Sequence, residues 1–338
     1  MDRTGYGCWA FGLGQTRCAS TVPVLVKPGD AEVSDRLLIL LWHNVEGTWY
    51  HPSRPGAGMQ GLTRQLKGLK RLATVVPLTS ALDTLMAGNS LPRRAVALTF
   101  DDGYRDNLEL AASLLQELEL PATFFLIPGI LSREVRPWWE SVAWGFTCSS
   151  RPTVTWGGKV LATQGMLGRR SYLWVAERLK LLNRASLERS VTDLLELLAP
   201  TGEPNHDGLF LDWDGARRLV QQGFAVGSHS MYHTVLSRET PDEQARNLAA
   251  SRARLEAELG VPAELVAYPS GTRADYDAST VDAAKRAGHT YALAAHAGVH
   301  TSRTSPYAIP RFVMVPTQGF SEIVARRVMR RLQLVIQR

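Results

Sequence analysis

Two adjacent carboxylates end an apolar run in the sequence AVALTFDDGYRDN, residues 95–107. The apolar residues continue to Phe100, and Asp101, Asp102 and Gly103 follow directly. Neighbouring side chains of a strand point to opposite faces. The two carboxylates can therefore share a site only where the strand gives way to a turn, which Gly103 favours. Because two like charges beside a buried strand are costly, the pair predicts a nearby cation.

A histidine pair lies downstream in GSHSMYH, where His229 and His233 are four residues apart. On a helical turn this spacing would place both imidazoles on one face, within reach of one metal ion. Two histidines and one carboxylate leave coordination positions open, as a catalytic metal requires. The second carboxylate could then act as a general base toward a water held by that metal. Either motif alone usually has no catalytic role: a DDG sequence is most often a turn, and a pair of histidines four apart most often binds no metal. The prediction therefore depends on their combination.

Short apolar runs alternate with helical patterns along most of the chain. They predict buried strands in parallel βα units, and in a barrel of such units the chemistry lies at the C-terminal ends of the strands. The predicted strands cover 36–42, 74–78, 95–100, 122–127, 224–228, 264–269, 290–295 and 307–314, and the predicted helices cover 59–72, 106–120, 212–223, 240–260 and 278–288. Polar residues end or follow four of these strands: Asp101, His229, Tyr268 and His296.

TFDDGY followed by HSMYH resembles the polysaccharide deacetylase family, also called the NodB homology family or carbohydrate esterase family 4. The resemblance runs from about residue 37 to 315, with one interruption. It implies a distorted (β/α) barrel that hydrolyses an N-acetyl group of a sugar. It also implies a divalent metal ion, most often zinc, with cobalt or nickel as alternatives. Asp101 then corresponds to the general base, and the metal ligands correspond to Asp102, His229 and His233.

A further motif, AYPSG, stands where the family has a motif whose backbone donates to the tetrahedral oxyanion. The resemblance assigns this donor to the amide of Ser270, beside Tyr268 and Pro269. Ala267 stands where the family often has an arginine that contacts the base. Arg311, in the last predicted strand, is placed to substitute for that arginine.

Three histidines complete the resemblance. The family's general acid is a late histidine, for which His296 and His300 are rival candidates in this sequence. The early LLWHNV is similar to a segment that would bring His43 to the site. A buried histidine at the end of a strand is an equal alternative for His43.

Residues 133–211 interrupt the alternation and predict a helical insertion, with one or two amphipathic helices over 171–199. The insertion holds five of the nine tryptophans. Aromatic faces stack on sugar rings, so Trp138 and Trp139 are candidates for substrate contact. The other tryptophans are expected to pack the insertion on the barrel.

The ends of the chain look different from the barrel predicted over 36–319. Residues 1–35 show no periodicity and predict a loose segment. Residues 320–338 predict a basic amphipathic helix, which either contacts an anionic membrane surface weakly or packs on its own domain. The start of the sequence lacks the order of a signal peptide, and no apolar run has transmembrane length, so the location is expected to be cytoplasmic.

The composition is that of an ordinary globular protein, with 45% apolar and 21% charged residues. Three cysteines without a CxxC motif predict no disulfide framework. A net charge of +6 in 338 residues gives no reason to expect a nucleic-acid partner.

Together these features predict a metal-dependent carbohydrate N-deacetylase that acts on a sugar, a glycan intermediate or a sugar-bearing metabolite. A glycoside hydrolase is one alternative, but its acid and base usually come from separate strands on opposite sides of the bond. A non-catalytic carbohydrate-binding relative is another, and loss of the Asp101 carboxylate would have been its sign.

Overall fold

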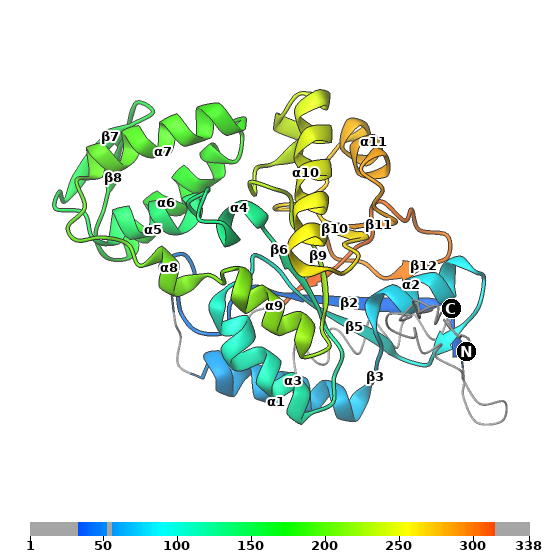
Figure 1. The fold of residues 1–338 in the computed structure, drawn as a ribbon. Helices are drawn as coiled ribbons and strands as arrows, with labels where there is room; N and C mark the ends of the chain where they lie inside the picture. The colour runs from blue at the N-terminus through cyan, green and yellow to red at the C-terminus, as the bar shows by residue number, and fades with distance from the viewer. Residues whose placement is uncertain (1–32, 53–55, 315–338) are drawn as a thin grey trace, which may run out of the picture.

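The computed structural model describes residues 33–52 and 56–314, and Figure 1 labels most of its helices and strands. The strands are β1 (Val33–Ser34), β2 (Arg36–Trp42), β3 (Thr74–Val75), β4 (Leu91–Pro92), β5 (Ala95–Phe100), β6 (Thr123–Leu126), β7 (Thr153–Trp156), β8 (Lys159–Ala162), β9 (Ala225–Ser228), β10 (Leu265–Ala267), β11 (Tyr291–Leu293), β12 (His300–Thr301) and β13 (Phe312–Val313). The helices are α1 (Gly58–Leu72), α2 (Leu78–Met86), α3 (Ser113–Glu117), α4 (Pro128–Leu131), α5 (Trp138–Thr147), α6 (Gly165–Leu179), α7 (Arg184–Leu198), α8 (His206–Leu209), α9 (Trp213–Gln221), α10 (Pro241–Leu259) and α11 (Ala278–Arg286), with a π-helix η1 (Asn107–Ala112) and a 3₁₀-helix η2 (Leu236–Arg238).

A parallel sheet forms the centre of the molecule, in the order β11-β10-β9-β6-β5-β2. The last described segment contacts both edges of this sheet. Ile309 bridges to Leu293 at the end of β11, and β13 pairs in parallel with β2. The sheet therefore curls toward closure, which confirms the distorted barrel that the resemblance implies.

Both faces of the strands are buried, as their continuous apolar sequences predict. Along β2, Leu37 and Ile39 belong to the apolar cluster that fills the inside of the barrel. Leu38, Leu40 and Trp42 belong to the outer cluster, which includes residues of α1, α3 and α9. This alternation follows from the two-residue period of a strand.

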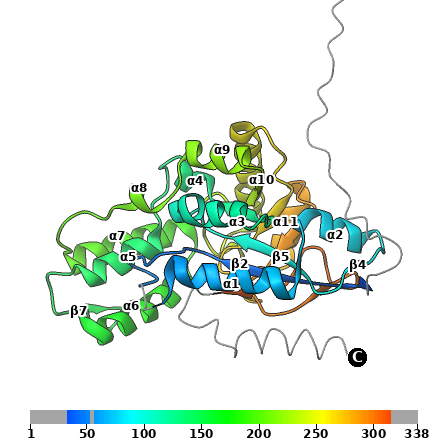
Figure 2. The same ribbon diagram turned by 90° about the horizontal axis from the view of Figure 1, so that it is seen from below.

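Helix α2 closes the end of the barrel at which the strands begin. Its residues Leu82 and Leu85 join the inner cluster, and Tyr291, the first residue of β11, donates a hydrogen bond of 2.7 Å to Asp83. In Figures 1 and 2, α2 and the insertion lie on opposite sides of the molecule. The end of the barrel where the strands finish is therefore the end available for a site.

The insertion is a helical lobe beside the sheet (Figure 2). Its helices α5, α6 and α7 pack around an apolar cluster that also includes Tyr104, Ile127 and Ile130 of the barrel. The amphipathic pattern over 171–199 divides between two helices, because Asn183 N-caps α7 by accepting a hydrogen bond from Ser186 N–H. The hairpin β7–β8 was not predicted. It reverses at Gly157 and Gly158, both with positive φ, as a two-residue type I′ turn requires.

Three predicted elements differ from the structure. The strand predicted over 74–78 is wrong beyond Val75, because Pro77 N-caps the unpredicted helix α2. The helix predicted over 106–120 begins as the π-helix η1 before α3. The strand predicted over 307–314 is reduced to β13, because the segment crosses from one edge of the sheet to the other.

The other predicted strands and helices are confirmed, each within two residues at either end. Helix α10 has the predicted limits, and capping residues account for both of its ends. Thr240 and Glu243 form a capping box at its start, and Gly260 adopts a left-handed conformation at its end.

Parts of the predicted ends lie beyond the described residues, namely residues 1–32 and all of 320–338. Within the described ranges, the helices are too short or too polar to cross a membrane.

Candidate active site

The two carboxylates separate where β5 ends. Asp101 N–H still donates to Trp42 O at 2.9 Å, which continues the pairing of β5 with β2. Asp102 and Gly103 then turn the chain, with φ of +72° and +74°. A positive φ is unusual for a residue with a side chain, and such conformations concentrate at functional sites. The turn thus lets both buried carboxylates face one site, as the sequence predicts.

The histidine pair is held by a turn that begins where β9 ends. His233 N–H donates to the Ser230 hydroxyl at 3.0 Å, and both residues have positive φ. The expected helical turn is therefore wrong, because these two residues have left-handed backbones. The two imidazoles still come together, with ring centroids 4.9 Å apart.

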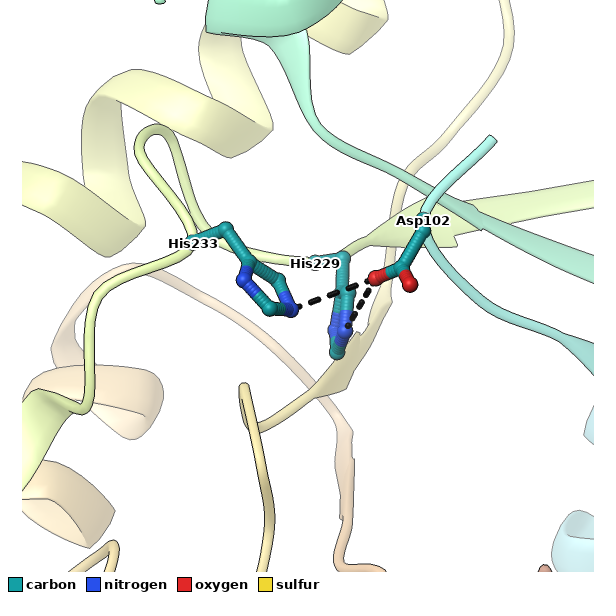
Figure 3. A group of neighbouring side chains, drawn as sticks. All are labelled: Asp102, His229 and His233. Atoms are coloured by element: carbon teal, nitrogen blue, oxygen red, sulfur yellow. Dashed lines mark ion pairs between the residues drawn. The ribbon is translucent and has the colours of Figure 1, made fainter. Parts of the chain in front are cut away.

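Asp102 and the two histidines form one cluster (Figure 3). Asp102 Oδ1 lies 3.3 Å from His229 Nε2 and 3.2 Å from His233 Nε2. One donor atom of each residue lies within 4.8 Å of those of the others. Figure 3 shows both rings directed at the carboxylate, so the three groups enclose a common point.

The donor atoms of this cluster fit a divalent metal ion. His229 Nδ1 lies 2.8 Å from Ala267 O, which can only accept, so Nδ1 carries a hydrogen. In a neutral ring, Nε2 then directs a lone pair toward Asp102 Oδ1. That oxygen is buried and has no hydrogen-bond partner among the described residues. Lone pairs that converge in a buried place need a cation or a proton between them, and two imidazoles with one carboxylate are typical zinc ligands.

The electrostatics of the cluster show the same need for positive charge. Burial would raise the pKa of the Asp102 carboxyl, but His233 and His229 outweigh burial and hold that pKa well below its usual range. Burial would lower the pKa of His229, but Asp101 and Asp102 raise it above its usual value. Burial prevails at His233 and lowers its pKa. A proton thus favours His229 when no cation is bound.

Asp101 is bound by a buried arginine, as the sequence predicts. Arg311 Nη1 and Nη2 donate to the two carboxylate oxygens of Asp101, each at 2.8 Å. Arg311 Nε donates to Ala294 O at 3.1 Å. Arg311 is 0% exposed and Asp101 is 2% exposed, so the pair is shielded from water. Such a bidentate pair fixes the plane of the carboxylate.

A cavity of about 520 Å³ opens over the cluster and Asp101. Of the other residues singled out in the sequence, those that line it are His43, Trp138, Trp139, Tyr268 and Ser270. Helix α6 and the residues after it contribute Glu177, Lys180 and Leu181. The insertion and the barrel therefore form this cavity together.

Ser270 lies at the centre of a three-residue γ-turn beside the cavity. Gly271 N–H donates to Pro269 O at 2.7 Å, and Ser270 has a φ of +60°. Among the described residues, no acceptor is found for Ser270 N–H. Pro269 holds the turn but is not a lining residue.

The two candidates for the general acid lie outside the lining of the cavity. His296 follows β11, and its Nε2 lies 3.3 Å from the Tyr276 hydroxyl. His300, in β12, pairs with Leu37 at the beginning of β2. The site lies beyond Trp42 at the other end of that strand, roughly 17 Å away at 3.3 Å per residue. His300 therefore belongs to the far end of the barrel.

A His300→Leu substitution tests this placement. We expect kcat to stay within about twofold, because the ring lies far from the reacting groups. Burial lowers the pKa of His300 to about 4. Between that value and 6.5, the unfolded chain binds a proton here that the folded chain does not, so the free energy of unfolding falls as the pH decreases. Removing the ring should make that fall shallower by up to about 1.4 kcal/mol per pH unit, measured by urea unfolding at pH 7 and pH 5. A large loss of kcat with an unchanged fold would contradict the placement.

Sequence reasoning missed several lining residues. Tyr50 and His51 reach the cavity from the loop after β2. Burial, with a smaller contribution from His43, lowers the pKa of His51 to about 4, so this ring is neutral at pH 7. The feature of the sequence that could have indicated them is their position after the predicted strand 36–42. The amphipathic pattern over 171–199 gave no indication that Glu177, Lys180 and Leu181 would line the site.

The fold is that of the NodB-type carbohydrate deacetylases, a curled barrel with its site where the strands end. A family model described as polysaccharide deacetylase matches residues 88–292, more than half of the chain, and the chain belongs to that family. None of the curated proteins matches the chain.

Several solved structures share the fold. The Streptococcus pyogenes deacetylase PplD in complex with acetate is 16% identical with a TM-score of 0.57, and the alignment covers 86% of this chain and 97% of that one. A de-N-acetylase from Aggregatibacter actinomycetemcomitans is 16% identical with a TM-score of 0.55, over 86% of this chain and 99% of that one. IcaB from Ammonifex degensii is 20% identical with a TM-score of 0.54, over 84% and 93%. The similarity of fold covers most of each chain.

Proposed function

We propose that this protein is a metal-dependent carbohydrate N-deacetylase. The observation that carries the proposal is the unpartnered, buried oxygen of Asp102 between two imidazole nitrogens. Beside it, the Asp101 carboxylate stands in the same cavity without being needed as a ligand. A metal triad and a separate base are what hydrolysis of an amide requires.

Asp102, His229 and His233 would hold the ion. When bound, a divalent ion supplies a water of lowered pKa and positive charge for the developing oxyanion. The remaining chemistry belongs to the side chains of this protein.

Asp101 accepts the proton of the attacking water. Arg311 holds both carboxylate oxygens, so Asp101 presents a fixed lone pair to that water. Ser270 N–H, which has no acceptor among the described residues, donates to the oxyanion as the acetyl carbon becomes tetrahedral. The leaving amine then needs a proton, and His296 and His43 remain for this step. His43 lines the cavity, whereas His296 follows β11 at the same end of the barrel.

The substrate is an N-acetylated sugar, either free or as part of a glycan or a metabolite. The family supports this class, and Trp138 and Trp139, 8% and 5% exposed, present ring edges to the cavity that they line. We propose no nucleic-acid partner. Cytoplasmic location and weak membrane contact through 320–338 stay predictions of the sequence.

The alternative of a glycoside hydrolase fits poorly. Asp101 Oδ2 and Asp102 Oδ1 lie 3.7 Å and 3.3 Å from the same atom, His229 Nε2. Two carboxylates around one imidazole are not placed on opposite sides of a glycosidic bond. A non-catalytic relative would have no use for a buried Asp101–Arg311 pair beside a complete triad.

Metal removal tests the proposal directly. We expect about one equivalent of divalent ion per chain, loss of acetate release after treatment with a chelator, and recovery with Zn²⁺ or Co²⁺. Metal content by mass spectrometry and acetate release from a panel of N-acetylated sugars are the measurements. Full activity in a sample shown to be free of metal would exclude this function.

A further inference from the structure

A buried carboxylate outside the triad and its base joins the insertion to the site. Glu140, in α5, is 0% exposed. Its Oε1 accepts a hydrogen bond of 2.8 Å from the Tyr104 hydroxyl, and its Oε2 accepts one of 3.0 Å from Tyr50 N–H. No lysine, arginine or histidine of the described chain forms an ion pair with it. Burial raises the pKa of the Glu140 carboxyl, and hydrogen bonds from Thr48, Tyr50 and Tyr104 oppose that rise, so this buried group demands well-placed donors.

The donors of Glu140 come from two parts of the catalytic cavity. Tyr104 follows the carboxylate pair and Gly103 directly, in the loop after β5. Tyr50 belongs to the loop after β2 and lines the cavity. Glu140 thus holds α5 of the insertion against both loops.

The network continues to one of the metal-binding histidines. Trp139 Nε1–H donates to the Tyr104 hydroxyl oxygen at 2.9 Å. The ring centroid of Trp139 lies 4.3 Å from that of His233. Tyr104 and Trp139 are 1% and 5% exposed, so these contacts are shielded from water.

The two histidines differ in how their rings are oriented. His229 Nδ1 is fixed by its hydrogen bond to Ala267 O. His233 Nδ1 is buried and lacks a hydrogen-bond partner in the described ranges. A metal-binding histidine is normally oriented by a hydrogen bond from its other nitrogen. At His233 the described contact that can restrict the ring is the packed indole of Trp139, with ring centroids 4.3 Å apart.

We propose that Glu140, Tyr104 and Trp139 are positioning residues that orient His233 for the metal, so that docking of the insertion sets the metal affinity. The inference rests on the proposed metal site. Glu140 fixes the hydroxyl of Tyr104, this hydroxyl fixes the indole of Trp139, and the indole limits rotation of the His233 ring.

Two tyrosines offer a matched comparison. Tyr104→Phe removes the donor to Glu140 and the acceptor for Trp139 together. Tyr172→Phe removes another hydroxyl from a tyrosine that is 3% exposed, one that donates to Tyr50 O at 2.8 Å. Tyr172, in α6, thus connects the insertion to the loop after β2, as Glu140 does. Among the described residues, it has no hydrogen bond that leads to Trp139 or His233. Both variants lose a buried hydroxyl between the lobe and the barrel.

The measurements are the Kd of the full chain for Zn²⁺, from competition with a chromophoric chelator, and the visible absorption of the Co²⁺ form. We expect Tyr104→Phe to weaken Zn²⁺ binding by about 10–100-fold and to change the Co²⁺ spectrum. Tyr172→Phe should keep the affinity within about threefold, although its Tm falls. Equal Zn²⁺ affinities for the two variants would overturn the inference. A wild-type chain that binds no metal would overturn the proposed function as well.

A second pair keeps the test decisive if Tyr104→Phe does not fold. Trp139→Phe keeps an aromatic ring near His233 but loses the donor to Tyr104, and Glu140→Gln keeps an acceptor for Tyr104 without the charge. We expect Trp139→Phe to weaken Zn²⁺ binding and Glu140→Gln to retain more of it. Wild-type affinity in Trp139→Phe would contradict the role of the network.

Discussion

Asp102→Ala should leave the protein without bound metal and without deacetylase activity, whereas Asp101→Asn should keep its metal and lose about 10²–10⁴-fold in rate. The two residues are adjacent, but only Asp102 has its oxygen between the two imidazole nitrogens. Asp101 instead has both oxygens bound to Arg311. Asparagine keeps the shape of Asp101 but cannot accept the proton of the attacking water.

Metal content and turnover must be measured on the same preparations of both variants. Circular dichroism serves as the control for folding, because Asp101→Asn leaves the buried charge of Arg311 without its partner and should lower the Tm. Loss of metal from Asp101→Asn together with retention by Asp102→Ala would mean that the roles are exchanged. Full activity with bound metal in both variants would mean that TFDDG is only a turn.

The barrel was predictable because its strands are buried on both faces. Continuous apolar runs such as RLLILLW need no knowledge of the partner strand to be recognised, and the βα alternation then fixes the class of fold. Helix α2 was missed because LTSALDTLM is short and follows a proline directly. This segment is helical because it covers the open end of the barrel. A local sequence pattern does not reveal that long-range contact.

In the site, too, some residues were predictable from the local sequence, and others depend on tertiary packing. Asp102 and His229 follow predicted strands, so the rule about strand ends places them. The convergence of His233 depends on a left-handed turn at Ser230, and helical spacing gave the wrong reason for it. Lys180 and Glu140 gave no signal, because they reach the site region only after the insertion packs on the barrel. Charge and spacing along the chain do not encode that docking.

The role of Arg311 was predicted from a residue that is missing in another motif, far from it in the sequence. With Ala267 where the family often has an arginine, the base needed another cation, and the last segment supplies one through bonds of 2.8 Å to each oxygen. The guanidinium also lies 5.3 Å from the centroid of the Phe125 ring. A side chain with so many contacts and no exposure contributes to stability as well as to catalysis.

Arg311→Met should therefore reduce both the rate and the free energy of unfolding. Removing one partner of a buried ion pair leaves an uncompensated charge, which costs about 3–5 kcal/mol. Arg311→Lys should recover only part of the rate, because an ammonium cannot bind both oxygens side by side.

The double variant Asp101→Asn with Arg311→Met separates stability from catalysis. It removes both charges, so it should unfold at a higher urea concentration than either single variant while remaining as slow as Asp101→Asn. This follows because each single change leaves one buried charge behind, and the second change removes that charge. Urea unfolding of the wild type, both single variants and the double variant gives the coupling free energy between the two side chains in stability. Initial rates of acetate release from the same four proteins give the corresponding coupling in catalysis. Strictly additive losses of stability would mean that the pair contributes no interaction, and Arg311 would then act through its other bonds, to Ala294 O and the Thr99 hydroxyl.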